Sequence, residues 1–130
     1  MAWHFTGASL RDGRQLPAID EVLRHDGPLE LCSSGLHASE RLLDALSYAP
    51  GPLLHRVRLG GEMLSASDKF CASERTILWS LDATAPMRQF ARQQAQSVLH
   101  LWSAPNVVVR FLETGDESLR GAARAAAWDA

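Results

Sequence analysis

Alternation of apolar and polar residues is the dominant pattern in the first 80 residues. Alternation of this kind is typical of strands that bury one face against a core. Several stretches alternate in this way or are short and apolar enough to suit a strand. They are residues 3–6, 28–32, 53–59, 62–65, 70–72 and 76–79. The pattern predicts a small, mainly antiparallel sheet in this part of the chain.

Glycines separate several of these stretches. Gly60 and Gly61 favour a tight turn, so residues 62–65 are expected to return as the hairpin partner of residues 53–59. Gly35 ends the strand predicted at residues 28–32. The pattern is weakest between residues 8 and 27, where a short helix or strand near residues 19–23 is the only element expected.

One helix interrupts the sheet. Leu42, Leu43 and Leu46 recur at the spacing of a helix, and Ser39 is a suitable N-cap. Two prolines at residues 50–52 end it.

The last 50 residues change to helical periodicity. An apolar face runs from residue 86 to residue 103, and an alanine-rich segment follows Asp116, which can cap it. Residues 105–114 contain three consecutive valines, which suit a strand, but a proline and Gly115 at the two ends favour a helix. The chain is therefore expected to be a single α+β domain over residues 1–130, with a mixed part at 1–82 and a helical part at 83–130.

Composition supports one ordinary globular domain. The chain has 130 residues, 46% of them hydrophobic, and a formal charge of −2. This charge gives no field that would attract a polyanion, so specific nucleic-acid binding is not expected. The N-terminus lacks the pattern of a signal peptide, which predicts a cytoplasmic protein without a membrane segment. Cys32 and Cys71 are expected to be free thiols in that reducing compartment.

Residues 30–38 form a motif, Glu-Leu-Cys-Ser-Ser-Gly-Leu-His-Ala. With the Asp-Ala-Leu-Ser-Tyr segment that follows, it resembles a family of small uncharacterised phage and prophage proteins whose core reads E-L-C-x-x-G-[FL]-H-A. Leu36 stands where that family tends to have Phe. The resemblance implies an accessory protein of a mobile element, and such proteins often serve host takeover or counter-defence. It implies no reaction.

The order of elements is also similar to that of compact ADP-ribosyltransferases. In those enzymes a first-strand His or Arg holds the ribose, a glycine-containing segment packs under the nicotinamide of NAD, and a late Glu orients the ribose. The resemblance implies His4, His37, Tyr48 and Glu113 as the catalytic candidates here. Glu62 and Glu74 are further candidates, and none of the three glutamates stands in a telling motif.

Other chemistries receive less support from the sequence. Cys32 and His37, with Cys71 and His25 or His55, could supply four zinc ligands, but the spacing matches no known zinc motif, so no metal is expected. Cys32 could be a nucleophile with His37 as its base only if the two side chains meet. Phosphate loops, dinucleotide-binding glycine motifs and nucleophile elbows are absent from the sequence.

Three residues near the C-terminus are candidates for partner binding. Trp128 projects from an alanine-rich helix that buries little area by itself, and Trp102 and Arg124 are the other candidates. The partner could be a host protein or complex, a second copy of the chain, or the domain itself.

Three functions therefore remain open. The leading hypothesis is a phage-type accessory protein that binds a host macromolecule and inhibits bacterial defence, as an anti-CRISPR protein does, with no cofactor. The alternatives are a minimal ADP-ribosyltransferase-like enzyme that uses NAD, and a structural assembly module.

Overall fold

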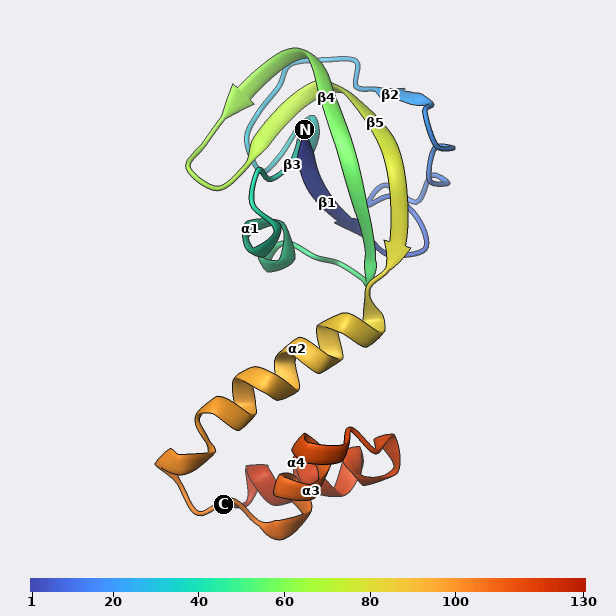
Figure 1. The fold of residues 1–130 in the computed structure, drawn as a ribbon. Coiled ribbons are helices and arrows are strands. Elements are labelled where there is room, and N and C mark those ends of the chain that lie inside the picture. The colour runs from blue at the N-terminus through green and yellow to red at the C-terminus, as the bar shows by residue number, and fades with distance from the viewer. The chain divides into compact units, whose positions relative to one another are not determined.

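The computed structural model describes all residues from 1 to 130 and divides the chain into two compact units. Met1–Ala83 form a unit built on a sheet, and Thr84–Ala130 form a helical unit (Figure 1). The sequence predicted the change from sheet to helices after residue 82, and the contacts divide the chain after Ala83. The predicted α+β class is confirmed.

The first unit is a curled antiparallel sheet of five strands in which β4 and β5 are the long central pair (Figure 1). Pairing follows the order β1-β4-β5-β2, and β3 also pairs with β5. The strands are β1 (Ala2–Thr6), β2 (Val22–Arg24), β3 (Leu36–Ala38), β4 (Leu53–Ser65) and β5 (Phe70–Asp82).

The sheet closes on itself between β1 and the end of β3. The backbone N–H of Trp3 donates to the Ser39 carbonyl at 2.7 Å, and the Ser39 N–H donates back to Trp3 at 2.9 Å. These two bonds join the outer strands, so β1, β4, β5 and β3 form a small barrel. We call Met1–Ala83 the barrel unit.

The predicted hairpin at Gly60 and Gly61 is wrong. Strand β4 continues through both glycines to Ser65, and the true partner is β5, which merges the two short strands predicted at 70–72 and 76–79. The pairing shifts between Gly60 and Met63, where Gly61 has φ +69°. The glycines therefore form a bulge that bends a continuous strand.

The segment from residue 28 to residue 39 also differs from the prediction. Residues 28–32 form no named strand, and only Glu30 and Ser34 pair, across a tight turn. The strand follows Gly35 as β3. Ser39 is not a helix cap, because the helix α1 (Leu42–Ser47) has Arg41 at its N-cap position, and Arg41 makes no side-chain cap bond. The Ser39 backbone instead closes the barrel.

The core of the barrel unit lies on one face of the sheet. Ala2, Ala38, Val57 and Ile77 are almost completely buried there, with Leu59 and Phe70 packed against them. Ala2 is paired directly with Val57, and Val57 with Ile77, so β1, β4 and β5 all contribute to this face.

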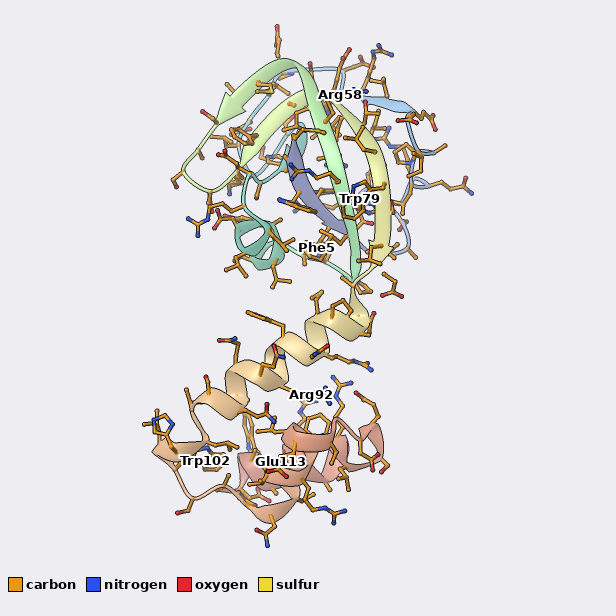
Figure 2. All side chains as sticks on the ribbon, viewed as in Figure 1. Phe5, Arg58, Trp79, Arg92, Trp102 and Glu113 are labelled. Carbon is orange, nitrogen blue, oxygen red and sulfur yellow. The ribbon has the colours of Figure 1, made fainter.

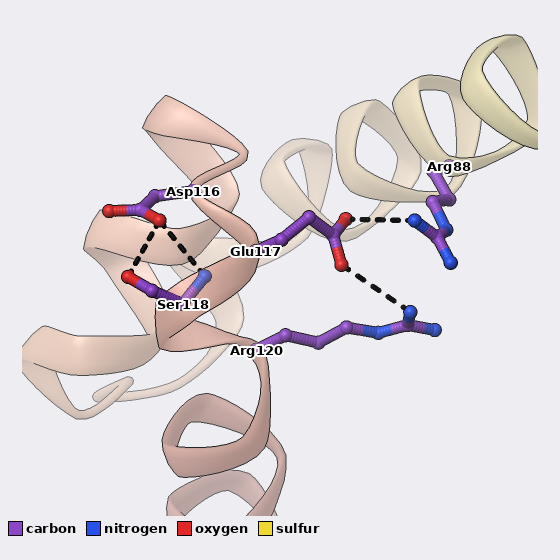
Figure 3. Close-up of polar contacts among 5 residues, drawn as sticks. All are labelled: Arg88, Asp116, Glu117, Ser118 and Arg120. Atoms are coloured by element: carbon purple, nitrogen blue, oxygen red, sulfur yellow. Dashed lines mark hydrogen bonds and ion pairs between the residues drawn. The ribbon is translucent and has the colours of Figure 1, made fainter.

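The helical unit contains α2 (Thr84–Ser97), α3 (Asn106–Thr114) and α4 (Arg120–Trp128), with short 3-10 turns η1 (Leu99–Leu101) and η2 (Glu117–Leu119) between them. The predicted helix at 105–114 is confirmed, and it ends at Gly115 with φ +67°. Asp116 accepts a bond from the Ser118 N–H, so it caps η2, the turn that leads into α4 (Figure 3). No helix in the structure is long and apolar enough to cross a membrane.

Candidate functional site

Polar side chains enter the core face of the barrel unit from three strands. Strand alternation places His4 on the same face as Ala2, and His4 is paired directly with His55 on β4. The two imidazoles stack with their centroids 6.3 Å apart. His55 is only 1% exposed, and its ring nitrogens bond Thr6 and Ser80, each at 2.7 Å.

Arg75 is the third basic group on this face. It lies opposite Leu59 and two residues before Ile77, both of which pack in the core. Arg75 is 6% exposed, and its Nη1 donates to the His37 carbonyl at 2.7 Å. Burial lowers the pKa of Arg75 to about 10, so the guanidinium remains charged at neutral pH.

Burial and the Arg75 charge also act on the histidines. The pKa of His4 lies well below its usual value, first because of burial and then because of electrostatic repulsion between protonated His4 and Arg75, with smaller contributions from His55 and His37. Burial and Arg75 lower the pKa of His55 as well. Burial lowers the pKa of His37, although a backbone hydrogen bond at Gly35 opposes that shift. At neutral pH this cluster therefore holds one cation and uncharged imidazoles.

A second polar cluster lies at the surface of the barrel unit. Tyr48 donates a hydrogen bond to Asp68, and Lys69 Nζ donates to the Tyr48 hydroxyl at 3.2 Å while lying 4.4 Å from the centre of the tyrosine ring. Hydrogen bonds with Cys32 and with Tyr48 raise the pKa of Lys69. Cys32 is exposed and has φ +70°, which is unusual for a residue with a side chain.

The geometry does not support His37 as a general base for the Cys32 thiol. His37 Nε2 accepts the backbone N–H of Cys32 at 3.0 Å, so this nitrogen is occupied by the main chain. Cys71 is fully buried, its thiol donates to the Ser34 carbonyl at 3.1 Å, and both cysteines are free. The structure contains no group of three or more His, Cys, Asp or Glu side chains that could hold a metal ion.

The helical unit carries an apolar hollow. Only Val108 and Ala123 are buried in this unit, and an apolar groove of about 850 Å³ opens among α2, α3 and α4. We call it the helical groove. Its lining includes Val98, Trp102, Phe111, Arg124 and Ala127.

Glu117 sits on the rim of the helical groove and ties two helices together. One carboxylate oxygen lies 3.4 Å from Arg88 of α2, and the other lies 3.5 Å from Arg120 of α4 (Figure 3). Arg124, also in the lining, has no ion-pair partner. Because the single Glu117 carboxylate is shared by two arginines and Arg124 has no partner, this part of the groove carries an excess of positive charge.

The partner-binding candidates predicted from the sequence fall at this groove. Trp102 and Arg124 line it, and Arg124 also lines a second hollow that includes Trp128, which is 89% exposed. Figure 2 shows Trp102 on the helical unit.

The catalytic candidates are divided between the two units. His4 and His37 both lie near Arg75 in the barrel unit, and Tyr48 is exposed in the surface cluster with Lys69. Glu113 is on α3 of the helical unit (Figure 2). Sequence reasoning missed Arg75. The only signal in the sequence was that Arg75 directly precedes the strand predicted at residues 76–79. That signal became informative only when the structure showed that the strand includes Arg75.

Comparison with known proteins gives one match. The model of a family described as a domain of unknown function, DUF7666, matches residues 2–89. No curated protein and no solved structure matches the chain. Because the matched residues make up more than half of the chain and include every strand of the barrel unit, the protein belongs to the DUF7666 family.

Proposed function

We propose that this protein acts by binding another protein, and that the helical groove receives an amphipathic helix of that partner. The observation that supports the proposal is the unusual exposure of apolar side chains in the helical unit. Val98, Leu101, Trp102 and Trp128 are between 41% and 89% exposed, although monomeric proteins rarely leave apolar side chains gathered in one place.

The chemistry of the groove determines which helix would fit. Its lining is mainly apolar, which suits the buried face of an amphipathic helix, and it includes the exposed Trp102, whose residue type is the most enriched at binding hot spots. The unpaired charge of Arg124 favours a carboxylate on the partner helix. The partner is therefore expected to present leucine-type anchors beside an acidic residue.

Alanine at Trp102 is expected to weaken binding of the captured partner by about 30-fold or more, because such a truncation at a hot spot costs about 2 kcal/mol or more. The partner would be captured from a bacterial lysate, identified by mass spectrometry, and titrated as a purified protein by calorimetry. Arg124→Glu should also weaken binding, and an Asp or Glu to Lys change in the partner helix should restore it.

Trp79→Ala is the matched control. Trp79 is a tryptophan on β5 that is 43% exposed, similar to Trp102, but it belongs to the barrel unit (Figure 2). Equal losses for Trp79→Ala and Trp102→Ala would contradict the proposal. A chain that forms a dimer in solution and becomes monomeric on Trp102→Ala would show instead that a second copy occupies the groove.

The resemblance of residues 30–38 to phage and prophage proteins supports a finer proposal, that the partner is a component of host defence such as a CRISPR–Cas complex. Expression of the protein in a strain with an active CRISPR–Cas system should then restore plaque formation by a targeted phage. The Trp102→Ala variant should restore it less, and no difference from an empty vector would contradict this finer proposal.

An ADP-ribosyltransferase-like activity is the second candidate, because His4 and His37 both lie near one buried arginine. Incubation with labelled NAD and lysate tests it. If the wild type transfers label and His4→Ala does not, the result would support an ADP-ribosyltransferase-like activity. If His4→Ala transfers label as well as the wild type, the result would exclude a catalytic site at His4.

A further inference from the structure

The buried guanidinium of Arg75 has no negative partner in the barrel unit. No carboxylate forms an ion pair with it, and the nearest acidic residue in the sequence, Glu74, is paired with Arg24 at 3.1 Å. Burying a charge without a counter-charge is costly, so buried cations in folded proteins are normally paired. The only compensation that the structure gives Arg75 is one hydrogen bond to the His37 carbonyl.

Most of the donor capacity of Arg75 is also unused. A guanidinium carries five N–H donors in a planar fork. Arg75 as a whole is 6% exposed and makes a single hydrogen bond to the protein, through Nη1. Its remaining nitrogens are not among the fully buried unpaired atoms, so they are accessible to a small ligand. An arginine fork of this kind binds two oxygens of an anion at once.

His4 provides a second set of free polar atoms on the same face. Its ring stacks on His55, but neither ring nitrogen has a hydrogen-bond partner in the protein. His4 is only partly buried, so solvent reaches its side of the cluster. An uncharged imidazole can donate one hydrogen bond to an anion.

We propose that the core face of the barrel unit binds a phosphate-type oxyanion between Arg75 and His4. The guanidinium would bond two oxygens and supply the counter-charge, and the His4 N–H would bond a third. A tetrahedral anion uses these three donors better than a planar carboxylate, which offers only two oxygens. The same chemistry would accept free phosphate or the phosphate group of a larger molecule. This inference does not depend on the function proposed for the helical groove.

The test is a titration of the full chain with inorganic phosphate, followed through the His4 ring proton resonances by NMR and through the melting temperature. Sodium chloride at equal ionic strength is the reference. Phosphate is expected to shift the His4 signals saturably and to raise the melting temperature by several degrees once it is about 100-fold above its dissociation constant. Acetate should give a smaller effect, and AMP distinguishes a bound phosphate group from free phosphate.

Arg75→Met separates binding from a structural role. The variant removes the unpaired charge and keeps an apolar side chain of similar length, so its melting temperature in chloride should equal or exceed that of the wild type, while its response to phosphate should be lost. Arg58→Met is the control, because Arg58 is exposed on β4 (Figure 2), and it should keep the response.

Two results would overturn the inference. The first is a wild-type protein whose His4 signals respond alike to phosphate and to chloride. The second is an Arg75→Met variant that binds phosphate as the wild type does. If Arg75→Met does not fold, His4→Phe takes its place, because it keeps a planar ring and removes the donor. It is expected to weaken phosphate binding by about tenfold, the value of one hydrogen bond to a charged group.

Discussion

Replacement of Gly35 by alanine should destabilise the barrel unit by about 2–6 kcal/mol, the sum of about 1–3 for a strained backbone and about 1–3 for overpacking. Gly35 has φ +117°, a conformation that residues with side chains rarely adopt. A Cβ at this position would lie 2.4 Å from the Cys71 sulfur and 2.9 Å from a Leu29 methyl. Cys71 is fully buried, so the sulfur has little room to retreat.

Urea unfolding of the full chain, followed by NMR signals from β4 and β5, measures this effect. Gly13→Ala is the matched control: Gly13 has φ +85° but open space around its Cα, so only the backbone term applies. Equal losses for the two variants would show that Gly35 does not pack against Cys71. A Cys71→Ala change in the Gly35→Ala background should recover part of the loss, because it removes the sulfur that the new methyl meets.

The second large effect is loss of stability in mild acid. His4, His37 and His55 all have a lowered pKa in the folded chain. Below about pH 6.5 the unfolded chain therefore binds protons that the folded chain does not. Each histidine that stays neutral lowers the free energy of unfolding by about 1.4 kcal/mol per pH unit as the pH falls, until the folded-state pKa is reached. His37 should contribute less than His4 and His55, because its Gly35 hydrogen bond opposes the shift of its pKa.

Hydrogen exchange of β4 and β5 between pH 7 and pH 5, corrected for the intrinsic exchange rate, would report this loss. The helical unit is an internal reference because its only histidine, His100, is exposed. The slope of the free energy of unfolding against pH gives the number of protons taken up on unfolding. His55→Gln should reduce this number by about one, even though it also changes the two hydrogen bonds that His55 makes. His100→Gln should leave the slope unchanged. A barrel unit whose stability is constant from pH 7 to pH 5 would contradict the buried neutral state of these histidines.

Local patterns predicted the elements that depend on neighbouring residues. The strand near residue 3 and the helix that ends at Gly115 follow from alternation and from a glycine with positive φ, and both are present. The elements that were missed depend on distant partners. Residues 36–38 become a strand because they pair with Phe70–Ala72. Ser39 pairs with Trp3 through its backbone and does not cap a helix. No local signal encodes either pairing.

The candidate site shows the same division. His4 and His37 could be selected by residue type, but their common neighbour Arg75 could not, because its burial results from the inward face of a strand whose extent was unknown. The partner-binding candidates were easier to select, since Arg124 and Trp128 stand out among the alanines of α4 and Trp102 is a large aromatic side chain.

The family match also separates the two proposals. Residues 2–89 include all of the barrel unit's strands and only the first residues of α2. An oxyanion site at Arg75 therefore belongs to the part of the chain that defines the family, and the helical groove lies almost entirely outside it.

Closure of the barrel between Trp3 and Ser39 has a consequence for synthesis of the chain. β1 leaves the ribosome before the other strands, yet its partner strand β4 begins at Leu53, and its other contact, Ser39, comes just after β3. The apolar residues of β1, including Phe5, therefore stay without their β4 partners until the chain has been made beyond residue 53. Pairings between such distant segments form slowly and leave apolar surface exposed in the meantime. The nascent chain would be most vulnerable to aggregation, and most in need of a chaperone, before β4 is complete.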